Sequence, residues 1–209
     1  MSSKFNVAVL ISGGGTTLRN LIERQQADEL DATIALVISS NSQAKGIHFA
    51  ETAGIRVQVF DHREFTDPDS ISNEIFTACR EADIELVALG GFLRKLKIPN
   101  DFVNRVVNIH PSLIPAYCGA GMYGMRVHQA VIENGSPITG CTVHFVDNQF
   151  DHGPIIAQES VQVQKEESPE ELAARVFELE CELYPRVINA IARGEIRVDG
   201  DVVVPREPG

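Results

Sequence analysis

The sequence predicts an α/β fold, in which helices cover both faces of a doubly wound, mostly parallel, Rossmann-like sheet. The first observation is that short apolar runs alternate with segments of helical apolar spacing over about the first 110 residues. The second is that glycine-rich or polar motifs directly follow several apolar runs, at the strand ends where such sheets bind ligands. The chain has 209 residues, which suits a single domain spanning residues 1–209.

The first half contains a series of expected strands with helices between them. Phe5–Ile11 is a continuous apolar run that ends in glycines, and a helical pattern follows those glycines. Further apolar runs predict the strands Thr33–Ile38, Arg56–Phe60, Glu85–Leu89 and Val106–Ile109. Helical patterns between these runs cover Gln43–Ala53 and Ser70–Ala82.

The second half continues without a linker. We expect a short helix, two strands joined by a turn, and a closing hairpin at Val127–Glu133, Thr142–Val146, Ile155–Val163 and Val198–Val202. A long helix should begin after Ser168, because Ser168 can cap it and Glu171 completes a capping box. It should continue to about Arg193, with Pro185 as a candidate kink.

The charge and composition exclude some classes of partner. The net charge is −11 and no basic stripe is present, so we expect no nucleic-acid partner, because Lys and Arg supply most of that affinity. No apolar run reaches the ~20 residues that span a bilayer, and the N-terminal segment lacks the features of a secretory signal. We therefore expect a cytoplasmic protein without a membrane partner.

The four cysteines, Cys79, Cys118, Cys141 and Cys181, form no C-x-x-C pair and match no zinc spacing. Reduced thiols in a cytoplasmic protein explain them better than a disulfide or a metal site. We predict no metal site. The chain is expected to be a monomer or a homodimer.

The glycine-rich loop Gly13–Thr17 is the first motif that could carry chemistry. Glycines let the backbone approach a ligand closely, and the unpaired N–H groups of the following helix favour an anion. The loop therefore predicts phosphate binding by Gly14, Gly15, Thr16 and Thr17. A plain tight turn is the alternative. Leu18 stands where a dinucleotide fingerprint has its third glycine, and no Gly-Lys-Ser/Thr follows.

The second motif is Asn108-Ile109-His110-Pro111, at the end of an expected strand. Alternate strand residues share a face, so Asn108 and His110 should point the same way. An amide and an imidazole placed together could stabilise an oxyanion and move a proton. The alternative is a polar strand end that faces solvent.

Two acidic residues complete the set of candidates. Asp151 begins an Asp-His-Gly-Pro segment, which is most often simple turn chemistry, and the sequence does not place it near His110. Glu180 lies on the same helical stripe as Leu172 and Val176, so its carboxylate should face the core. It could meet a ligand there, or it could reach solvent from the edge of the stripe.

Taken together, these motifs resemble the phosphoribosylglycinamide formyltransferase family, the folate-dependent enzymes of purine synthesis. The resemblance covers nearly the whole chain and follows the family's order of motifs. It lies in the segments Val9–Gly15, Leu89–Arg94, Asn108–Pro115, Asp151–Gln158 and Glu180–Pro185. The segment Ala116–Arg126 departs from the commonest family form because it is longer, and its role is not assigned by the resemblance.

The resemblance implies a fold, two substrates and a set of site residues. The fold would be the Rossmann-like formyltransferase fold, with a phosphate-binding half at 1–100 and a catalytic and folate-binding half at 101–209. The activity would be formyl transfer from 10-formyltetrahydrofolate, a reduced folate, to glycinamide ribonucleotide. The implied catalytic residues are Asn108, His110 and Asp151. The implied substrate contacts are Gly14, Gly15, Thr16, Thr17, Pro111 and Glu180. The implied folate contacts are Leu93, Arg94, Lys95, Leu96 and Asp147.

Other functions remain open at the level of sequence. A formyltetrahydrofolate hydrolase normally adds an N-terminal domain and a methionyl-tRNA formyltransferase a C-terminal one, and neither addition is expected in 209 residues. A non-catalytic nucleotide- or folate-binding module would keep the glycine loop but need not keep the polar trio. A nicotinamide dehydrogenase is disfavoured by the missing third glycine.

Overall fold

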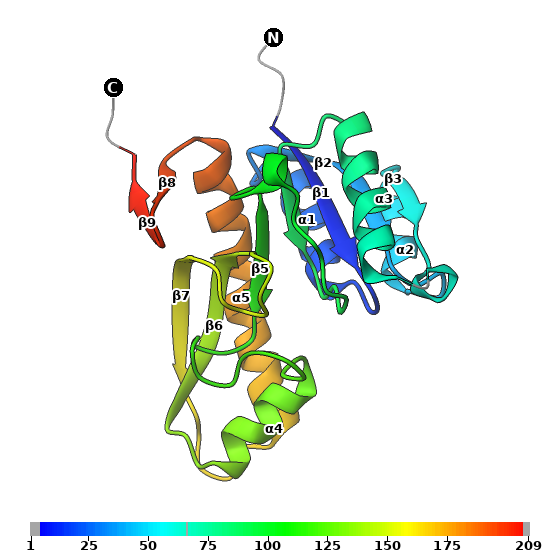
Figure 1. Ribbon diagram of the computed structural model, residues 1–209. Coiled ribbons are helices and arrows are strands. Elements are labelled where there is room, and N and C mark those ends of the chain that lie inside the picture. Colours follow the sequence, from blue (N-terminus) through cyan, green and yellow to red (C-terminus); the bar gives the residue numbers. More distant parts are fainter. Residues whose placement is uncertain (1–4, 66, 207–209) are drawn as a thin grey trace.

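The computed structural model describes residues 5–65 and 67–206 and is built around one seven-stranded sheet (Figure 1). Residues 1–4, part of the segment inspected for a secretory signal, lie outside the described residues. The strand order is β3-β2-β1-β4-β5-β6-β7. The strands are β1 Phe5–Ile11, β2 Ala32–Ser39, β3 Arg56–Val59, β4 Leu86–Leu89, β5 Val106–His110, β6 Ile138–Phe145 and β7 Ile155–Gln162.

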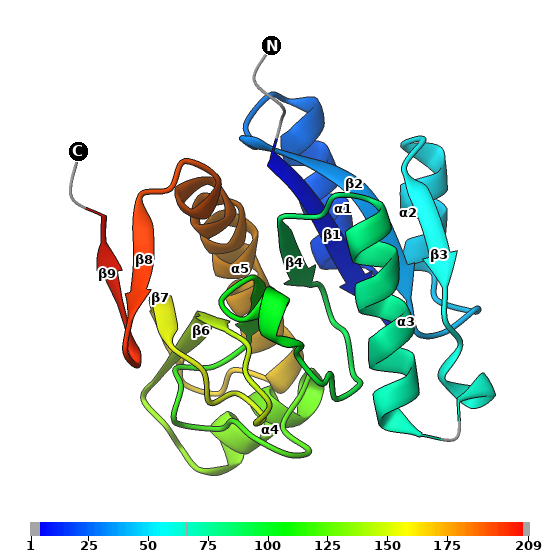
Figure 2. The same ribbon diagram turned by 45° about the horizontal axis from the view of Figure 1, so that its top comes forward.

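The first five strands in this order are parallel, and β6 and β7 pair antiparallel to their neighbours. Helices cover both faces (Figure 2). The helices are α1 Thr16–Gln26, α2 Gly46–Thr52, α3 Pro68–Glu81, α4 Met125–Glu133 and α5 Pro169–Ala192. The predicted α/β class with a mostly parallel, doubly wound sheet is confirmed.

Two apolar cores separate the layers. One face of the sheet packs against α1, α2, α4 and α5 through residues such as Leu21 and Val176. The other face packs against α3 through residues such as Phe76. The phenol of Tyr184 fixes α5 to the sheet, because its hydroxyl lies 3.1 Å from the carbonyl oxygens of both Leu89 and Val107. These contacts tie α5 to the carboxyl end of β4 and to the neighbouring strand β5.

The long C-terminal helix forms as its sequence indicates. Ser168 accepts a hydrogen bond from the backbone of Glu171, and the Glu171 side chain accepts one in return from the Ser168 backbone. The expected hairpin is also present, as β8 Ile196–Asp199 paired antiparallel with β9 Val202–Pro205.

The boundaries of β6 and α2 differ most from the prediction. β6 begins at Ile138, whereas Thr142 was the expected start. Gly140 interrupts the apolar pattern there, but the strand needs it: a Cβ at this position would lie 1.9 Å from the carbonyl oxygen of Glu159 on β7. Helix α2 begins at Gly46, three residues after the expected Gln43.

None of the helices in the described part of the chain combines the length and the apolar character that crossing a bilayer requires.

Candidate active site

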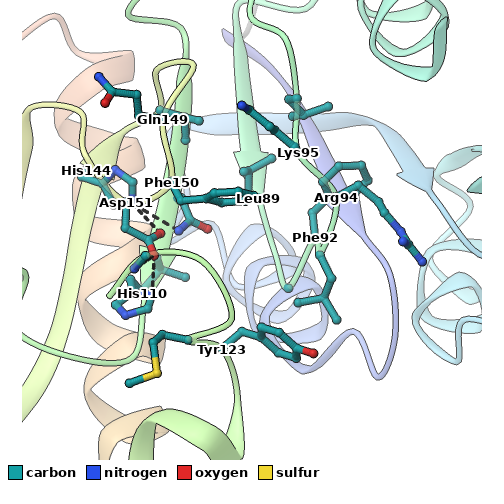
Figure 3. Close-up of a pocket in the computed structure, with 18 of the residues that line it drawn as sticks. Leu89, Phe92, Arg94, Lys95, His110, Tyr123, His144, Gln149, Phe150 and Asp151 are labelled. Carbon is teal, nitrogen blue, oxygen red and sulfur yellow. Dashed lines mark hydrogen bonds and ion pairs between the residues drawn. The ribbon is translucent and has the colours of Figure 1, made fainter. Parts of the chain in front are cut away.

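A cleft opens beyond the carboxyl ends of β4 and β5, where parallel sheets bind ligands (Figure 3). Its walls enclose about 970 Å³ of empty space, a volume that includes the open solvent at its mouth. Its walls come from the segments after β4 and β5 and from the loop between β6 and β7. The predicted residues that line it are Leu93, Arg94, Lys95, Leu96, Asn108, His110, Pro111, Asp147 and Asp151.

Asp151 lies between two histidines at one wall of this cleft (Figure 3). Its Oδ2 is 3.7 Å from Nδ1 of His110, and its Oδ1 is 3.8 Å from Nε2 of His144. Both distances are too long for hydrogen bonds, but at 3.7 Å the carboxylate is close enough to attract the His110 ring when that ring is protonated. The structure thus joins Asp151 to His110, a pairing that the sequence left open.

His110 has a defined orientation and a defined tautomer. It is 3% exposed, and its Nε2 lies 2.8 Å from the carbonyl oxygen of Tyr117. A carbonyl oxygen only accepts, so Nε2 must carry a proton and donate it. The proton that His110 gains or loses must therefore be carried by Nδ1, the nitrogen that faces Asp151.

His144 orients the amide of Asn108. The two residues are direct partners in the antiparallel pairing of β5 and β6. The Nδ1 of His144 donates to the carbonyl oxygen of Phe145 at 2.8 Å, which leaves Nε2 to accept from the Asn108 amide at 3.2 Å. Burial lowers the pKa of His144, which favours the neutral ring that this arrangement needs. The second N–H of the Asn108 amide remains available to a ligand.

The loop after β5 holds the carboxylate of Asp151. The backbone N–H of Gly119 donates to Oδ2 of Asp151 at 2.8 Å. Asp151 itself has a left-handed backbone, with φ of 50°. Gly153 follows in the same turn, where a Cβ would lie 2.0 Å from the carbonyl oxygen of Phe145. The Asp-His-Gly-Pro segment therefore does form a turn, and the same turn places the Asp151 side chain in the cleft.

The predicted folate segment forms a wall of the cleft. Leu96 is buried in the core, whereas Leu93, Arg94 and Lys95 are exposed at the surface of the cleft. The ammonium of Lys95 lies 5.9 Å from the ring centroid of Phe150, which comes from the facing loop. Lys95 on this segment therefore contacts Phe150 on the opposite wall of the cleft.

The glycine loop does not line this cleft but lies beside it. The Ser12 hydroxyl accepts a hydrogen bond from the backbone of Leu93 at 3.0 Å, and the Ser12 backbone donates to the carbonyl oxygen of Gly91 at 3.2 Å. Leu93 and Gly91 line the cleft, so these two hydrogen bonds connect the loop to its wall. Among the predicted phosphate contacts, the structure places Gly14, Gly15, Thr16 and Thr17 outside the cleft lining.

The glycines of this loop differ in what the fold requires of them. Gly15 has φ of +72°, and a Cβ there would lie 2.4 Å from the Cα of Gly46 on α2, so packing alone explains it. A Cβ on Gly13 or Gly14 would have no neighbour within 4 Å. Packing therefore does not explain why Gly13 and Gly14 are glycines. Their backbone is exposed and open to a ligand.

The first turn of α1 offers free N–H groups next to this open backbone. Gly15 caps the helix without a side-chain hydrogen bond, and the first turn contains no acidic residue. Such an N-terminus carries a partial positive charge and attracts an anion.

Glu180 is partly buried on α5 and outside the cleft lining. Burial raises the pKa of its carboxyl to about 8. Within residues 5–65 and 67–206 it makes no hydrogen bond or ion pair. A carboxyl without a partner in this position is suited to accept hydrogen bonds from a ligand.

Sequence reasoning missed His144, Tyr117 and Gly119. Thr142, Val143 and His144 alternate in polarity, which places His144 on the face opposite Val143. That alternation could have marked His144 as a candidate. Its pairing with Asn108 could not be read from it, because β5 and β6 meet through a long-range antiparallel contact. Tyr117 and Gly119 act through backbone groups, which leave no trace in side-chain type.

No metal site and no disulfide is found in the described part of the chain. It contains no cluster of three or more His, Cys, Asp or Glu residues arranged to hold an ion. The four cysteines are free thiols, and burial raises the pKa of Cys79 and of Cys141 to about 12.

Comparisons with known proteins identify the family of this chain. A formyl transferase family model matches residues 5–188. The chain is 36% identical over 92% of its length to phosphoribosylglycinamide formyltransferase of Haemophilus influenzae, of which it covers 89%. A crystallised relative from Symbiobacterium toebii, glycinamide ribonucleotide transformylase 1, superposes with a TM-score of 0.91 at 31% identity, and the match covers 99% of this chain and 96% of that one.

Several relatives are longer than this chain. It is 36% identical over 91% of its length to the chloroplastic phosphoribosylglycinamide formyltransferase of Arabidopsis thaliana, and it spans 66% of that protein. It is 38% identical over 94% of its length to the trifunctional purine biosynthetic protein adenosine-3 of Gallus gallus, of which it spans 19%. A chloroplastic relative means that the family does not fix the compartment, so a cytoplasmic location stays a prediction. The chain belongs to the phosphoribosylglycinamide formyltransferase family.

Proposed function

We propose that this protein transfers a formyl group from 10-formyltetrahydrofolate to the amine of 5-phosphoribosylglycinamide. The observation that carries the proposal is the Asp151 carboxylate between His110 and His144, with Asn108 beside them, at the wall of a cleft. Transfer requires that the amine nitrogen bond to the formyl carbon, that the carbon leave the donor nitrogen, and that one proton pass between the nitrogens.

Asn108 and His110 would stabilise the charge that develops on the formyl oxygen. His144 holds one N–H of the Asn108 amide, which fixes the amide plane before the reaction. A fixed donor does not have to reorganise as charge develops, and this preorganisation is usually the largest catalytic term. Loss of one such donor typically slows catalysis about 100- to 1000-fold.

His110 would move the proton through Nδ1. Its other nitrogen is occupied by the carbonyl of Tyr117, so Nδ1 is the position at which the ring gains and loses a proton. The negative charge of Asp151 at 3.7 Å stabilises the imidazolium. Holding both substrates in place would supply the remaining large contribution, because it removes the entropy cost of a bimolecular encounter.

The amine substrate would bind along the glycine loop. Its phosphate would accept hydrogen bonds from the open backbone at Gly14 and from the first turn of α1, with Gly15, Thr16 and Thr17 shaping that turn. Glu180 would accept hydrogen bonds from the ribose hydroxyls, and Pro111 would contact the substrate at the end of β5. In this account residues 1–100 form the phosphate-binding half of one domain.

The donor would occupy the cleft. Residues 101–209 would form the catalytic half of the domain and would supply most of the walls of the cleft. Leu93, Arg94, Lys95 and Leu96 would hold the reduced folate from one side, and Asp147 from the other. The mixed lining fits such a ligand, because it has apolar side chains for the rings and polar groups for the ring nitrogens and carboxylates.

The test compares kcat and KM of His110→Ala and Asp151→Asn with the wild type. Each variant should lower kcat by at least about 100-fold with little change in either KM, because the lost interactions belong to the transition state. His48→Ala is the matched control, because His48 is exposed on α2 and should retain wild-type kinetics. A near-normal kcat in either site variant would overturn the assignment.

A further inference from the structure

The loop that joins β5 to α4 presents an aromatic side chain to the cleft. We propose that Tyr123, supported by Arg126, is a specificity-determining residue that packs against the aminobenzoyl ring of the reduced-folate donor. The inference rests on the proposed function. It adds a ligand contact to the segment Ala116–Arg126, in which Tyr117 and Gly119 already hold His110 and Asp151 through their backbone groups.

The conformation of the loop exposes Tyr123. Its side chain lines the cleft and is 42% exposed, although an aromatic ring of this size normally gains by burial. Gly121 and Gly124 flank it with φ of +86° and +52°, backbone conformations that a residue with a side chain rarely adopts. Between these two glycines the Tyr123 ring lies at the cleft and outside the buried core.

The wall across the cleft is also apolar and exposed. Leu93 is 56% exposed and Phe150 is 52% exposed, and both line the same cleft as Tyr123. Figure 3 places Tyr123 and His110 toward one end of the cleft, and Lys95 and Gln149 toward the opposite end. Exposed apolar side chains gathered from three segments around one opening mark a binding surface for a flat apolar group.

Arg126 fixes the position of the ring. Its guanidinium carbon lies 4.9 Å from the ring centroid of Tyr123, which is within cation–π distance. Arg126 has no ion pair in the described part of the chain, and it does not line the cleft. Because Tyr123 lines the cleft and Arg126 does not, the proposal assigns one face of the ring to the guanidinium and the other face to the ligand.

The chemistry of the donor selects the aminobenzoyl ring as the group that reaches this face. The nitrogen that carries the formyl group is bonded directly to that ring and joins it to the pterin. With the formyl carbon at His110 and the pterin between the Leu93–Leu96 segment and the loop of Asp147, the aromatic ring must leave on the remaining side. The segment from Gly119 to Gly124 forms the wall there.

The experiment measures steady-state constants for both substrates in Tyr123→Ala, Tyr123→Phe and Arg126→Gln. Tyr123→Ala should raise the KM for 10-formyltetrahydrofolate roughly three- to tenfold, the range expected for one lost aromatic contact, with kcat and the KM for glycinamide ribonucleotide unchanged. Tyr123→Phe should restore the wild-type KM because the ring is retained. Arg126→Gln should raise the donor KM less, and should add nothing in the Tyr123→Ala background.

Matched controls are Val103→Ala, an exposed apolar residue outside the cleft, and Arg197→Gln on β8. An unchanged donor KM in Tyr123→Ala, or a rise in the KM for glycinamide ribonucleotide instead, would overturn this inference while wild-type turnover upholds the proposed function. A wild-type protein that does not turn over the donor would overturn the proposed function itself, and this inference with it.

Discussion

Two adjacent glycines in the loop after β1 allow ligand binding to be separated from packing. Gly15 packs against α2 and has a left-handed backbone, whereas a Cβ at Gly14 would meet no atom within 4 Å. If the loop binds the substrate phosphate, Gly14→Ala should impair binding without loss of stability. Gly15→Ala should destabilise the fold.

The structure sets the size of each effect. In Gly15→Ala the left-handed backbone costs about 1–2 kcal/mol, and the contact at 2.4 Å with the Cα of Gly46 adds a further 1–3 kcal/mol or so, as for an overpacked core. At roughly 2–4 °C per kcal/mol for a domain of this size, Tm should fall by at least about 4 °C. In Gly14→Ala the free energy of unfolding should change by no more than about 0.5 kcal/mol.

The assay combines thermal unfolding with the KM for glycinamide ribonucleotide. Gly14→Ala should raise this KM about tenfold or more, because the methyl group interferes with at least one charge-assisted hydrogen bond from the backbone. The KM for the folate donor should not change. A Gly14→Ala protein that keeps its KM for glycinamide ribonucleotide, or that unfolds as early as Gly15→Ala, would refute the reasoning.

Three further substitutions test the electrostatics and the core. The pKa of Glu180 is about 8 in the folded chain and near 4.5 when unperturbed, so its stabilising contribution is complete below pH 4.5 and is lost as the pH rises through 8. Glu180→Gln should therefore match the wild-type Tm at low pH and exceed it at pH 9 while raising the KM for glycinamide ribonucleotide; an equal Tm at both pH values would contradict this. Tyr184→Phe removes a buried hydroxyl that bonds to the sheet, and chemical denaturation should report a loss of about 1–2 kcal/mol, whereas no loss would mean that this bond contributes nothing. Arg175→Met leaves Glu167, whose side chain is 3% exposed, without its cation at 2.7 Å, and chemical denaturation should show a free energy of unfolding lower by at least about 1 kcal/mol, whereas an unchanged value would contradict the role of this ion pair.

Local signals were sufficient for much of the fold. β1 matches its apolar run from Phe5 to Ile11, and α5 begins at the residue that its capping box indicates. β6 shows where local signals fail. Gly140 is unfavourable for a strand by propensity, yet the close approach of β7 requires it, and that contact is absent from the local sequence.

The site was partly predictable for the same reason. Period-two alternation places Asn108 and His110 on one face of β5, and the sequence carries that information. The approach of Asp151 and the pairing of His144 with Asn108 depend on how β6 and the following turn fold back, over separations of 36 residues or more from Asn108. The tautomer of His110 depends on a backbone carbonyl, which any residue would supply at the position of Tyr117.

The most direct test of formyl transfer measures tetrahydrofolate release from 10-formyltetrahydrofolate with and without glycinamide ribonucleotide. We predict release only when the amine is present, one equivalent for each formylated product, and its loss in His110→Ala. Release at the same rate without the amine would identify a hydrolase, and no release under either condition would identify a binding module; either result would contradict the account.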